Sequence, residues 1–79
     1  MTEALAPDRT LDCKGLLCPM PIVKLSKALK EMASNELILL EATDPGSVPD
    51  VTAWSKQTGN PIVAQDRVDK VMRFWIRKA

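Results

Sequence analysis

The sequence predicts an α+β fold, a two-layer βαβαββ sandwich in which two helices cover one face of a mixed four-stranded sheet. Three observations lead to this prediction. Apolar and polar residues alternate over residues 9–13 and 70–78, as they do in half-buried strands. Apolar residues recur at helical spacing over residues 19–33 and again between Ser47 and Gly59. The near-continuous apolar run ELILLEAT, residues 36–43, suits a central strand.

The first half of the chain is expected to form a strand, a helix and a second strand. In the strand over residues 9–13, Leu11 and Cys13 should share one face. The helix is expected from Pro19 to about Ala33, and Asn35, a residue that tolerates the left-handed conformation, should end it. Its apolar stripe consists of Ile22, Leu25, Leu29 and Met32.

The second helix is bounded by turn-forming residues at both ends. The segment Asp44-Pro45-Gly46 is a turn signal, and Ser47 is expected to cap the helix that follows. Gly59 should end this helix, with Pro61 beyond it. The apolar stripe consists of Val48, Val51 and Trp54, of which Trp54 is expected in the core.

The chain should close with two strands, over residues 62–64 and 70–78. The polar connection over residues 65–69 lacks glycine, which favours a loop of several residues over a tight two-residue turn. In the last strand Trp75 should face outward, where an exposed ring would mark a partner surface. Right-handed crossovers place both helices on one face of the sheet, and a strand order of 1-2-4-3 makes the last strand antiparallel to the others.

Composition limits the classes of function. The 79 residues suit one small domain, expected over residues 9–79 after a flexible tail at residues 1–8. Eleven Lys and Arg against ten Asp and Glu give a net charge of +1, which argues against a dedicated nucleic-acid binder. Two cysteines without any histidine fall short of a metal site. The N-terminus lacks a signal-peptide pattern and no apolar run could cross a bilayer, so a cytoplasmic monomer is expected.

Cys18 stands in an unusual setting, directly before Pro19-Met20-Pro21. The sequence places it at the cap of the first helix, with Pro19 as the first helical residue. The positive end of a helix stabilises a thiolate, so its pKa is expected to fall below the ordinary value of about 8.5. The two prolines remove N–H groups and leave Met20 as the main donor of the first turn, which makes the expected shift moderate.

The segment LDCKGLLCPMP, residues 11–21, resembles the signature of the TusA/SirA-like sulfurtransferase family, an L-D-x-x-G-L-x-C-P-x-P pattern. The resemblance continues through the lysines of the first helix, through Ala42-Thr43-Asp44-Pro45-Gly46 and to Arg77-Lys78. It implies the same βαβαββ sandwich and a persulfide carrier without a cofactor. Cys18 would carry the sulfur, and the remaining motif positions would be Asp12, Gly15, Pro19, Met20 and Pro21.

The resemblance also implies protein partners. A donor such as a cysteine desulfurase or a rhodanese would load Cys18, and an acceptor protein would serve tRNA 2-thiouridine formation, molybdenum-cofactor synthesis or sulfur oxidation. Candidate docking residues are Lys14, Lys24, Lys27 and Asp44. The lysines are either a solvated helix face or a surface for acidic partners, and Asp44 is favoured as a residue that shapes its turn.

Other interpretations of single residues stay open. Cys13 is favoured as core filler, with a role as a resolving thiol for Cys18 as the alternative. Asp12 is favoured as a turn residue that accepts a hydrogen bond from the backbone of the Gly15 loop. Met20 suits either a partner contact or a residue folded over the core.

Two other functions remain as alternatives. One is a nucleic-acid-binding or regulatory module of the same fold, which the charge balance and the scarcity of aromatic residues disfavour. The other is a dithiol redox protein using Cys13 and Cys18, whose C-x₄-C spacing differs from the C-x-x-C of thioredoxin-like motifs.

Overall fold

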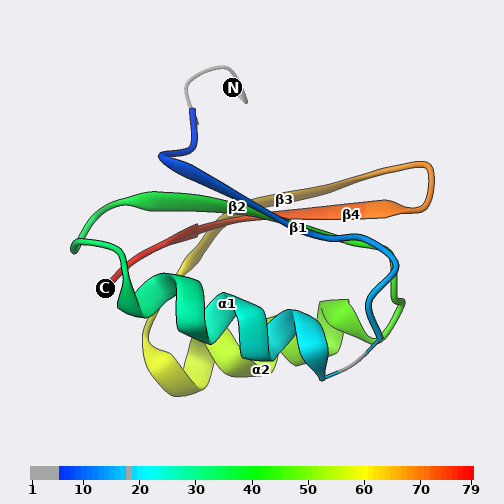
Figure 1. Ribbon diagram of the computed structural model, residues 1–79, viewed down its shortest axis with the longest axis horizontal. Helices are drawn as coiled ribbons and strands as arrows, with labels where there is room; N and C mark the ends of the chain where they lie inside the picture. Colours follow the sequence, from blue (N-terminus) through cyan, green and yellow to red (C-terminus); the bar gives the residue numbers. More distant parts are fainter. Residues whose placement is uncertain (1–5, 18) are drawn as a thin grey trace.

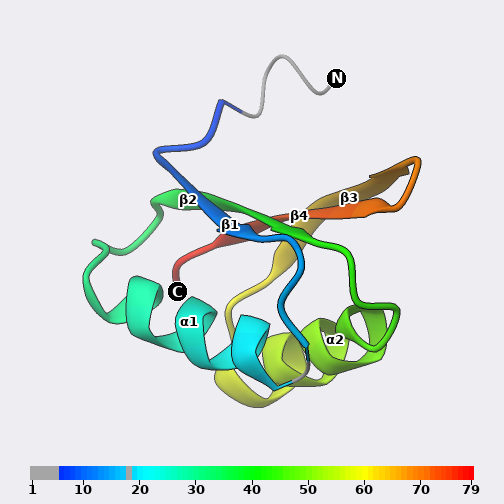
Figure 2. The ribbon, with the colours of Figure 1, turned by 45° about the vertical axis from the view of Figure 1, so that its right-hand side comes forward.

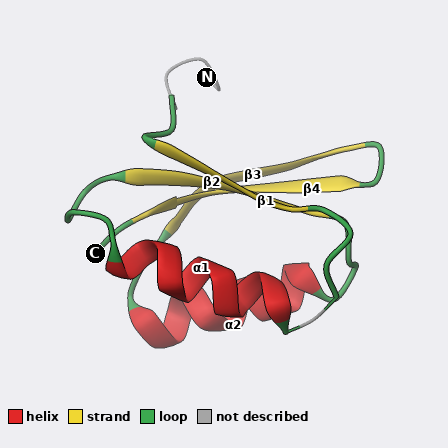
Figure 3. Cartoon of the chain, in the orientation of Figure 1, coloured by secondary structure: helices red, strands yellow, loops and turns green. Residues whose placement is uncertain are grey.

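The computed structural model describes residues 6–17 and 19–79, which form a sheet layer and a helix layer (Figures 1 and 3). The predicted βαβαββ order is confirmed, and Figure 2 shows both helices on the same side of the sheet. The elements are β1 (Arg9–Cys13), α1 (Met20–Lys30), β2 (Leu37–Ala42), α2 (Ser47–Thr58), β3 (Ile62–Val68) and β4 (Val71–Arg77).

The strand order is β1-β2-β4-β3, as the sequence predicts. Strands β1 and β2 run parallel, with Cys13 beside Ala42 at their carboxyl ends. Strand β4 runs antiparallel to both β2 and β3. Because α1 and α2 each follow one of the two parallel strands, both helices begin at the same end of the molecule, on the right in Figure 1.

The hydrophobic core fills the space between the two layers. The sheet supplies alternate residues of β2 and β4, and each helix supplies one apolar stripe, as the periodicity predicts. Met32 and Trp54 are buried members of this core, which confirms their predicted burial. The largest apolar side chains that are fully buried are Leu25, Ile38, Leu40, Val51, Phe74 and Ile76.

Helix α1 is shorter than predicted at both ends. Its cap is Pro19, with φ −98° and ψ 17°, and its first helical residue is Met20. The expectation that Cys18 is the cap and Pro19 the first helical residue is therefore wrong by one position. At the other end the helix stops at Lys30 and Glu31 caps it, because the last N–H groups bond to carbonyls three residues back. Asn35 is left-handed, with φ 74°, but lies in the turn before β2.

Helix α2 begins at Ser47, but its cap is Gly46, so the prediction that Ser47 is the cap is wrong. Ser47 instead buries its side chain to 2% exposure. The predicted end of the helix is confirmed: Gly59 adopts the left-handed conformation, with φ 77°, and its N–H donates to the Ser55 carbonyl at 2.9 Å.

Strand β3 is longer than predicted, because the expected loop over residues 65–69 belongs mostly to the strand. Ladder pairing continues to Val68 and Val71, and a two-residue turn, Asp69-Lys70, joins the strands. Asp69 supplies the positive φ, 55°, that the turn needs without glycine.

Trp75 faces the side of the sheet away from the helices, as predicted, but it is not exposed. Only 4% of the residue is accessible, and the Arg73 guanidinium lies 4.9 Å from the centre of its ring. A long side chain covers the aromatic face with its charged group. Trp75 therefore does not form the exposed surface for a partner that the sequence suggested.

The described chain is also joined to the sheet ahead of β1. Asp8, the last residue of the expected tail, donates its backbone N–H to the Leu37 carbonyl and accepts the Leu37 N–H on its carboxylate, both at 2.8 Å. Within residues 6–17 and 19–79, neither helix has the length and apolar character needed to cross a membrane.

Candidate functional site

The candidate site is the connection between β1 and α1, residues 14–19, at the end of the molecule where both helices begin (Figure 1). Carboxyl ends of parallel strands commonly carry ligand and reaction sites, since the loops that leave them converge there. Cys18 itself lies outside the described residues. The geometry of the site is therefore built from the residues on either side of it.

The connection opens with a turn over residues 13–16, closed by a 3.2 Å hydrogen bond from the Leu16 N–H to the Cys13 carbonyl. Gly15 adopts φ +81° in this turn, a conformation that residues with a Cβ rarely take. Its N–H donates to the Thr43 Oγ1 at 2.9 Å, which ties the turn to the end of β2. A Cβ built on Gly15 would meet nothing within 4 Å, so backbone conformation alone requires glycine here.

Asp12 stabilises the same turn from the end of β1. Its Oδ1 accepts the Lys14 N–H at 2.9 Å, which is the backbone hydrogen bond that the sequence predicts for Asp12. The Lys14 Nζ lies 3.8 Å from that oxygen and 3.5 Å from the Glu41 Oε1. Lys14 is therefore engaged by two carboxylates of the protein itself.

A backbone hydrogen bond between Leu17 and Met20 precedes α1. The Met20 N–H donates to the Leu17 carbonyl at 2.9 Å, and the Val23 N–H donates to the Pro19 carbonyl at 3.1 Å. The Met20 N–H, which was expected to be the main donor of the first turn, is thus paired with a backbone carbonyl. The two prolines differ: Pro19 is exposed, whereas Pro21 is fully buried and fixes the start of the helix to the core.

Apolar side chains lie on the surface near the start of α1. Leu17 is 73% exposed, Met20 44% and Val23 52%. We call these three residues the apolar rim. Next to it an open hollow of about 260 Å³ separates the start of α1 from α2, and Pro19 and Trp54 are among its lining residues. Of the two interpretations of Met20, the exposed position supports a contact residue over one folded onto the core.

The four candidate docking residues have different surroundings. Lys24 and Lys27 are exposed on α1, and neither forms an ion pair with any described residue. Lys14 is paired as described above. Asp44 shapes the turn before α2, as expected: its Oδ1 accepts the Gly46 N–H at 3.4 Å and its carbonyl accepts the Ser47 N–H at 2.9 Å.

Cys13 is fully buried in the core between the layers. Burial raises the pKa of its thiol; Lys24 acts in the opposite direction and Asp12 adds to the increase. The neutral thiol is thus favoured, and its sulfur has no contact with solvent. These properties fit the interpretation of Cys13 as core filler. They disfavour a resolving role, because another thiol cannot reach the buried sulfur.

Two features of this end of the molecule were not predicted. The link from Thr43 to Gly15 joins the two loops, although the sequence indicates only a continuous apolar strand that ends at Thr43. The hydroxyl of Ser47 is buried and finds no hydrogen-bond partner among the residues that the structure describes. In the sequence, Ser47 follows Pro-Gly and resembles a helix cap, so nothing indicated that its side chain would be buried.

Comparison with known proteins identifies the family. Residues 9–78 match the family described as "Sulfurtransferase TusA". A putative sulfur carrier protein of Bacillus subtilis, YrkI, is 45% identical over 71 residues, which cover 90% of this chain and 95% of that protein. The chain belongs to the TusA family. The sulfur carrier protein TusA of Allochromatium vinosum is 42% identical over 72 residues, covering 91% of this chain and 95% of the relative.

Two further matches concern the length of a relative and the fold. This chain matches only 37% of the length of YrkF, another putative sulfur carrier of Bacillus subtilis, at 43% identity over 86% of the chain. A SirA-like protein from Desulfitobacterium hafniense has the same fold, with a TM-score of 0.77 at 20% identity, over 87% of this chain and 95% of that one. Membership in the TusA family implies transfer of sulfur between a donor and an acceptor.

Proposed function

We propose that this TusA-family chain is a persulfide carrier and that Cys18 is the residue that bears the sulfur. The observation that carries the proposal is the contrast between the two cysteine positions. Cys13 is fully buried, whereas both sequence neighbours of Cys18, Leu17 and Pro19, are exposed. A partner protein can therefore reach the residues on both sides of Cys18, whereas it cannot reach Cys13.

The proposed chemistry is two thiol exchanges that balance without an oxidant or a reductant. The Cys18 thiolate attacks the outer sulfur of a donor persulfide, R–S–SH; the donor S–S bond breaks, R–S⁻ leaves and Cys18–S–SH forms. An acceptor thiolate then attacks the outer sulfur of Cys18–S–SH and regenerates the Cys18 thiolate. Each step moves one sulfur atom, so no resident cofactor is needed.

The residues around Cys18 have positioning roles in this proposal. Asp12 and Gly15 hold the first turn through the Lys14 N–H and Thr43 hydrogen bonds. Pro19 and Pro21 restrict the backbone before and within the first turn of α1. Met20, as part of the apolar rim, supplies contact area to a partner. These interactions limit the conformations of the loop that carries Cys18.

The partners would be a donor such as a cysteine desulfurase or a rhodanese and an acceptor protein with its own thiol. The acceptor would serve tRNA 2-thiouridine formation, molybdenum-cofactor synthesis or sulfur oxidation, in the cytoplasm, with the carrier acting as a monomer. The small apolar rim suits brief, weak docking, which a carrier with two successive partners requires. So do Lys24 and Lys27, which have no ion-pair partner within residues 6–17 and 19–79.

The first prediction concerns sulfur loading. The reduced full chain, incubated with polysulfide and then analysed by intact-protein mass spectrometry, should gain one sulfur atom that a reductant removes. Cys18→Ser should not gain it, because the attacking thiolate is absent. Cys13→Ser, the matched control, should load as the unchanged chain does, since a buried thiol takes no part.

Two outcomes would contradict this prediction. Loading of Cys18→Ser would assign the sulfur to another residue, and loss of loading in a folded Cys13→Ser protein would favour the dithiol mechanism. Capture of partners by the loaded chain, compared with Cys18→Ala, then tests the three acceptor pathways. Partners retained only by the loaded chain are expected to be proteins that have a thiol and belong to one of these three pathways.

A further inference from the structure

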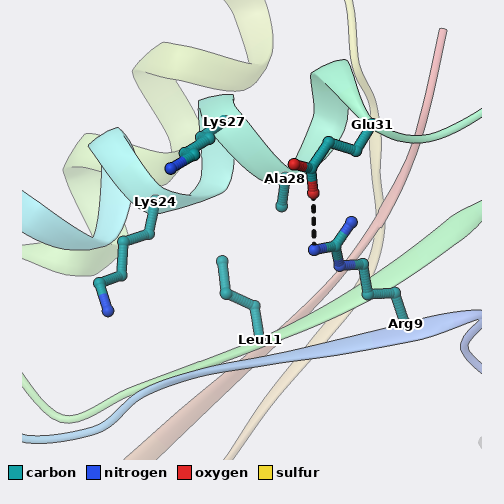
Figure 4. Close-up of a pocket in the computed structure, with 6 residues that line it drawn as sticks. All are labelled: Arg9, Leu11, Lys24, Lys27, Ala28 and Glu31. Carbon is teal, nitrogen blue, oxygen red and sulfur yellow. Dashed lines mark hydrogen bonds and ion pairs between the residues drawn. The ribbon is translucent and has the colours of Figure 1, made fainter.

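We propose that the groove between β1 and α1 receives an extended acidic segment of a partner protein, which adds to the free edge of β1. The inference rests on the proposed function, because it identifies how a carrier partner docks. The groove differs from the surface around Cys18: it lies along the side of the two-layer sandwich, where the edge strand faces the first helix (Figure 4).

The groove has an apolar floor and charged ends. Its volume is about 350 Å³, and Leu11 from β1 and Ala28 from α1 form the apolar part of its lining. Figure 4 shows Lys24 and Lys27 extending from α1 at one end. At the other end a 2.9 Å ion pair joins Arg9 to Glu31.

The charge of this groove favours an acidic occupant. Arg9 and Glu31 neutralise each other, which leaves the positive charges of Lys24 and Lys27 without an ion-pair partner among the described residues. The two lysines are three residues apart on one helix, a separation of about 5–6 Å between neighbouring side chains. Alternate residues of a strand are about 6.6 Å apart and point to the same side. Carboxylates at every second position of an extended segment can therefore face both lysines.

The backbone of β1 offers the second half of the interaction. Strand β1 pairs with β2 alone in the part of the chain that the structure describes, so its other side presents unpaired N–H and C=O groups. An extended segment can form a ladder with such an edge, and its alternate side chains then supply specificity.

The other edge of the sheet is less suitable for strand addition. Strand β3 has a register irregularity between Ile62 and Ala64, whereas the β1 ladder is regular from Arg9 to Cys13. A bulge bends and twists an edge and interrupts regular pairing. The groove also leads toward the connection between β1 and α1, because Lys24 lies one helical turn after Met20. A partner docked along β1 is thus positioned close to the loop that contains Cys18.

The test uses the reduced full chain and a capped hexapeptide probe, Glu-Thr-Glu-Val-Glu-Thr, followed by NMR titration and amide hydrogen exchange. We expect binding with shifts in β1 and α1, together with new protection of β1 amides. Lys24→Ala/Lys27→Ala should bind at least about tenfold more weakly, as expected for the loss of two charge contacts. The control Lys56→Ala/Lys70→Ala removes two exposed lysines elsewhere and should bind as the unchanged chain does.

A charge exchange provides a second test that does not depend on loss of binding. Lys24→Glu/Lys27→Glu should bind the matching peptide Lys-Thr-Lys-Val-Lys-Thr better than the acidic one. Equal binding by the groove and control variants, or protection at β3 in place of β1, would overturn the proposal. If free glutamate at equal carboxylate concentration produced the same β1 shifts, the groove would be a small-anion site and the proposal would also be wrong.

Failure of this inference can be told apart from failure of the proposed function. The peptide titration involves no sulfur donor, and the loading assay involves no peptide. Loading without peptide binding would refute the groove alone. Peptide binding by a chain that fails to load at Cys18 would refute the persulfide mechanism alone.

Discussion

At the scale of single residues, Gly15 has the clearest conformational requirement near the site. Its φ of +81° directs the chain from β1 into the loop, and its N–H reaches the Thr43 Oγ1. Empty space around a built Cβ means that contacts do not exclude a larger residue; the backbone conformation does. Gly59 has nearly the same φ, +77°, and equally free surroundings, but lies at the far end of α2.

These two glycines make a matched pair of substitutions. Gly15→Ala and Gly59→Ala should each lower the free energy of unfolding by about 1 kcal/mol, measured by urea denaturation, because alanine is disfavoured at positive φ. Only Gly15→Ala should also slow sulfur loading of Cys18, since only that loop carries the thiol. Equal loading rates in the two variants would show that the Gly15 turn does not contribute to the function of the loop.

At the scale of elements, the β3–β4 hairpin is held by a charged cluster on the sheet face away from the helices. The Arg73 guanidinium donates to both carboxylate oxygens of Asp66 and lies over the Trp75 ring. The hydrogen bond from Arg73 holds the pKa of Asp66 below its usual range. These cross-strand contacts accompany the regular pairing of residues that were expected to form a loop.

The stability of this hairpin should depend on pH in a defined direction. Because the Asp66 pKa is lowered in the folded state, its stabilising effect is complete above the unfolded value of about 3.9. It is lost as the pH falls through the lower folded value. Urea denaturation from pH 7 to pH 2 should therefore show that Asp66→Asn loses stability at neutral pH and that this difference disappears in acid. In an Arg73→Gln background the pH-dependent difference should be absent; its persistence would mean that another group lowers the Asp66 pKa.

At the scale of the whole molecule, the two-layer arrangement buries Cys13 and leaves the residues that flank Cys18, five positions later in the sequence, on the surface. Strand β1 directs Cys13 into the core, and the chain is back at the surface at Leu17 and Pro19. Reaction of Cys13 with a reagent therefore requires the structure around it to open. Its raised pKa lowers its reactivity further.

Thiol labelling tests this requirement. In Cys18→Ser, Cys13 should react with an aromatic disulfide reagent at least about a hundredfold more slowly in the native protein than in urea, because labelling requires opening of the core. In Cys13→Ser, the remaining Cys18 should react rapidly without urea. Immediate labelling of Cys13 in the native protein would show that its thiol is accessible after all.

Much of this architecture could be predicted, for identifiable reasons. The alternation around Leu11 and Cys13, and the helical spacing of Leu25 and Leu29, are local patterns that directly reflect burial on one face. Helix ends were less predictable. Pro19 suited the first helical position by propensity, but the hydrogen bond from the Met20 N–H to the Leu17 carbonyl moves the start of α1 by one residue.

The sequence predicted which segment contains the candidate site, but it did not predict the surroundings of the residues in that segment. The spacing of Asp12, Gly15 and Cys18 indicated the connecting loop as the candidate site. The sequence did not indicate that Lys14 and Lys24 have different surroundings. Both are lysines near the motif, yet among the residues that the structure describes Lys14 forms ion pairs and Lys24 forms none.

The sequence by itself determined the order of the elements, the family and the choice of Cys18 as the candidate carrier, because these depend on residue types at short spacings. Tertiary structure alone decided which groups meet across long separations: Gly15 with Thr43, Asp8 with Leu37, and β1 with α1 around the basic groove. Such contacts depend on how strands and helices are placed in space. Local periodicity specifies which face of an element is buried, but it does not specify the neighbours that bury it.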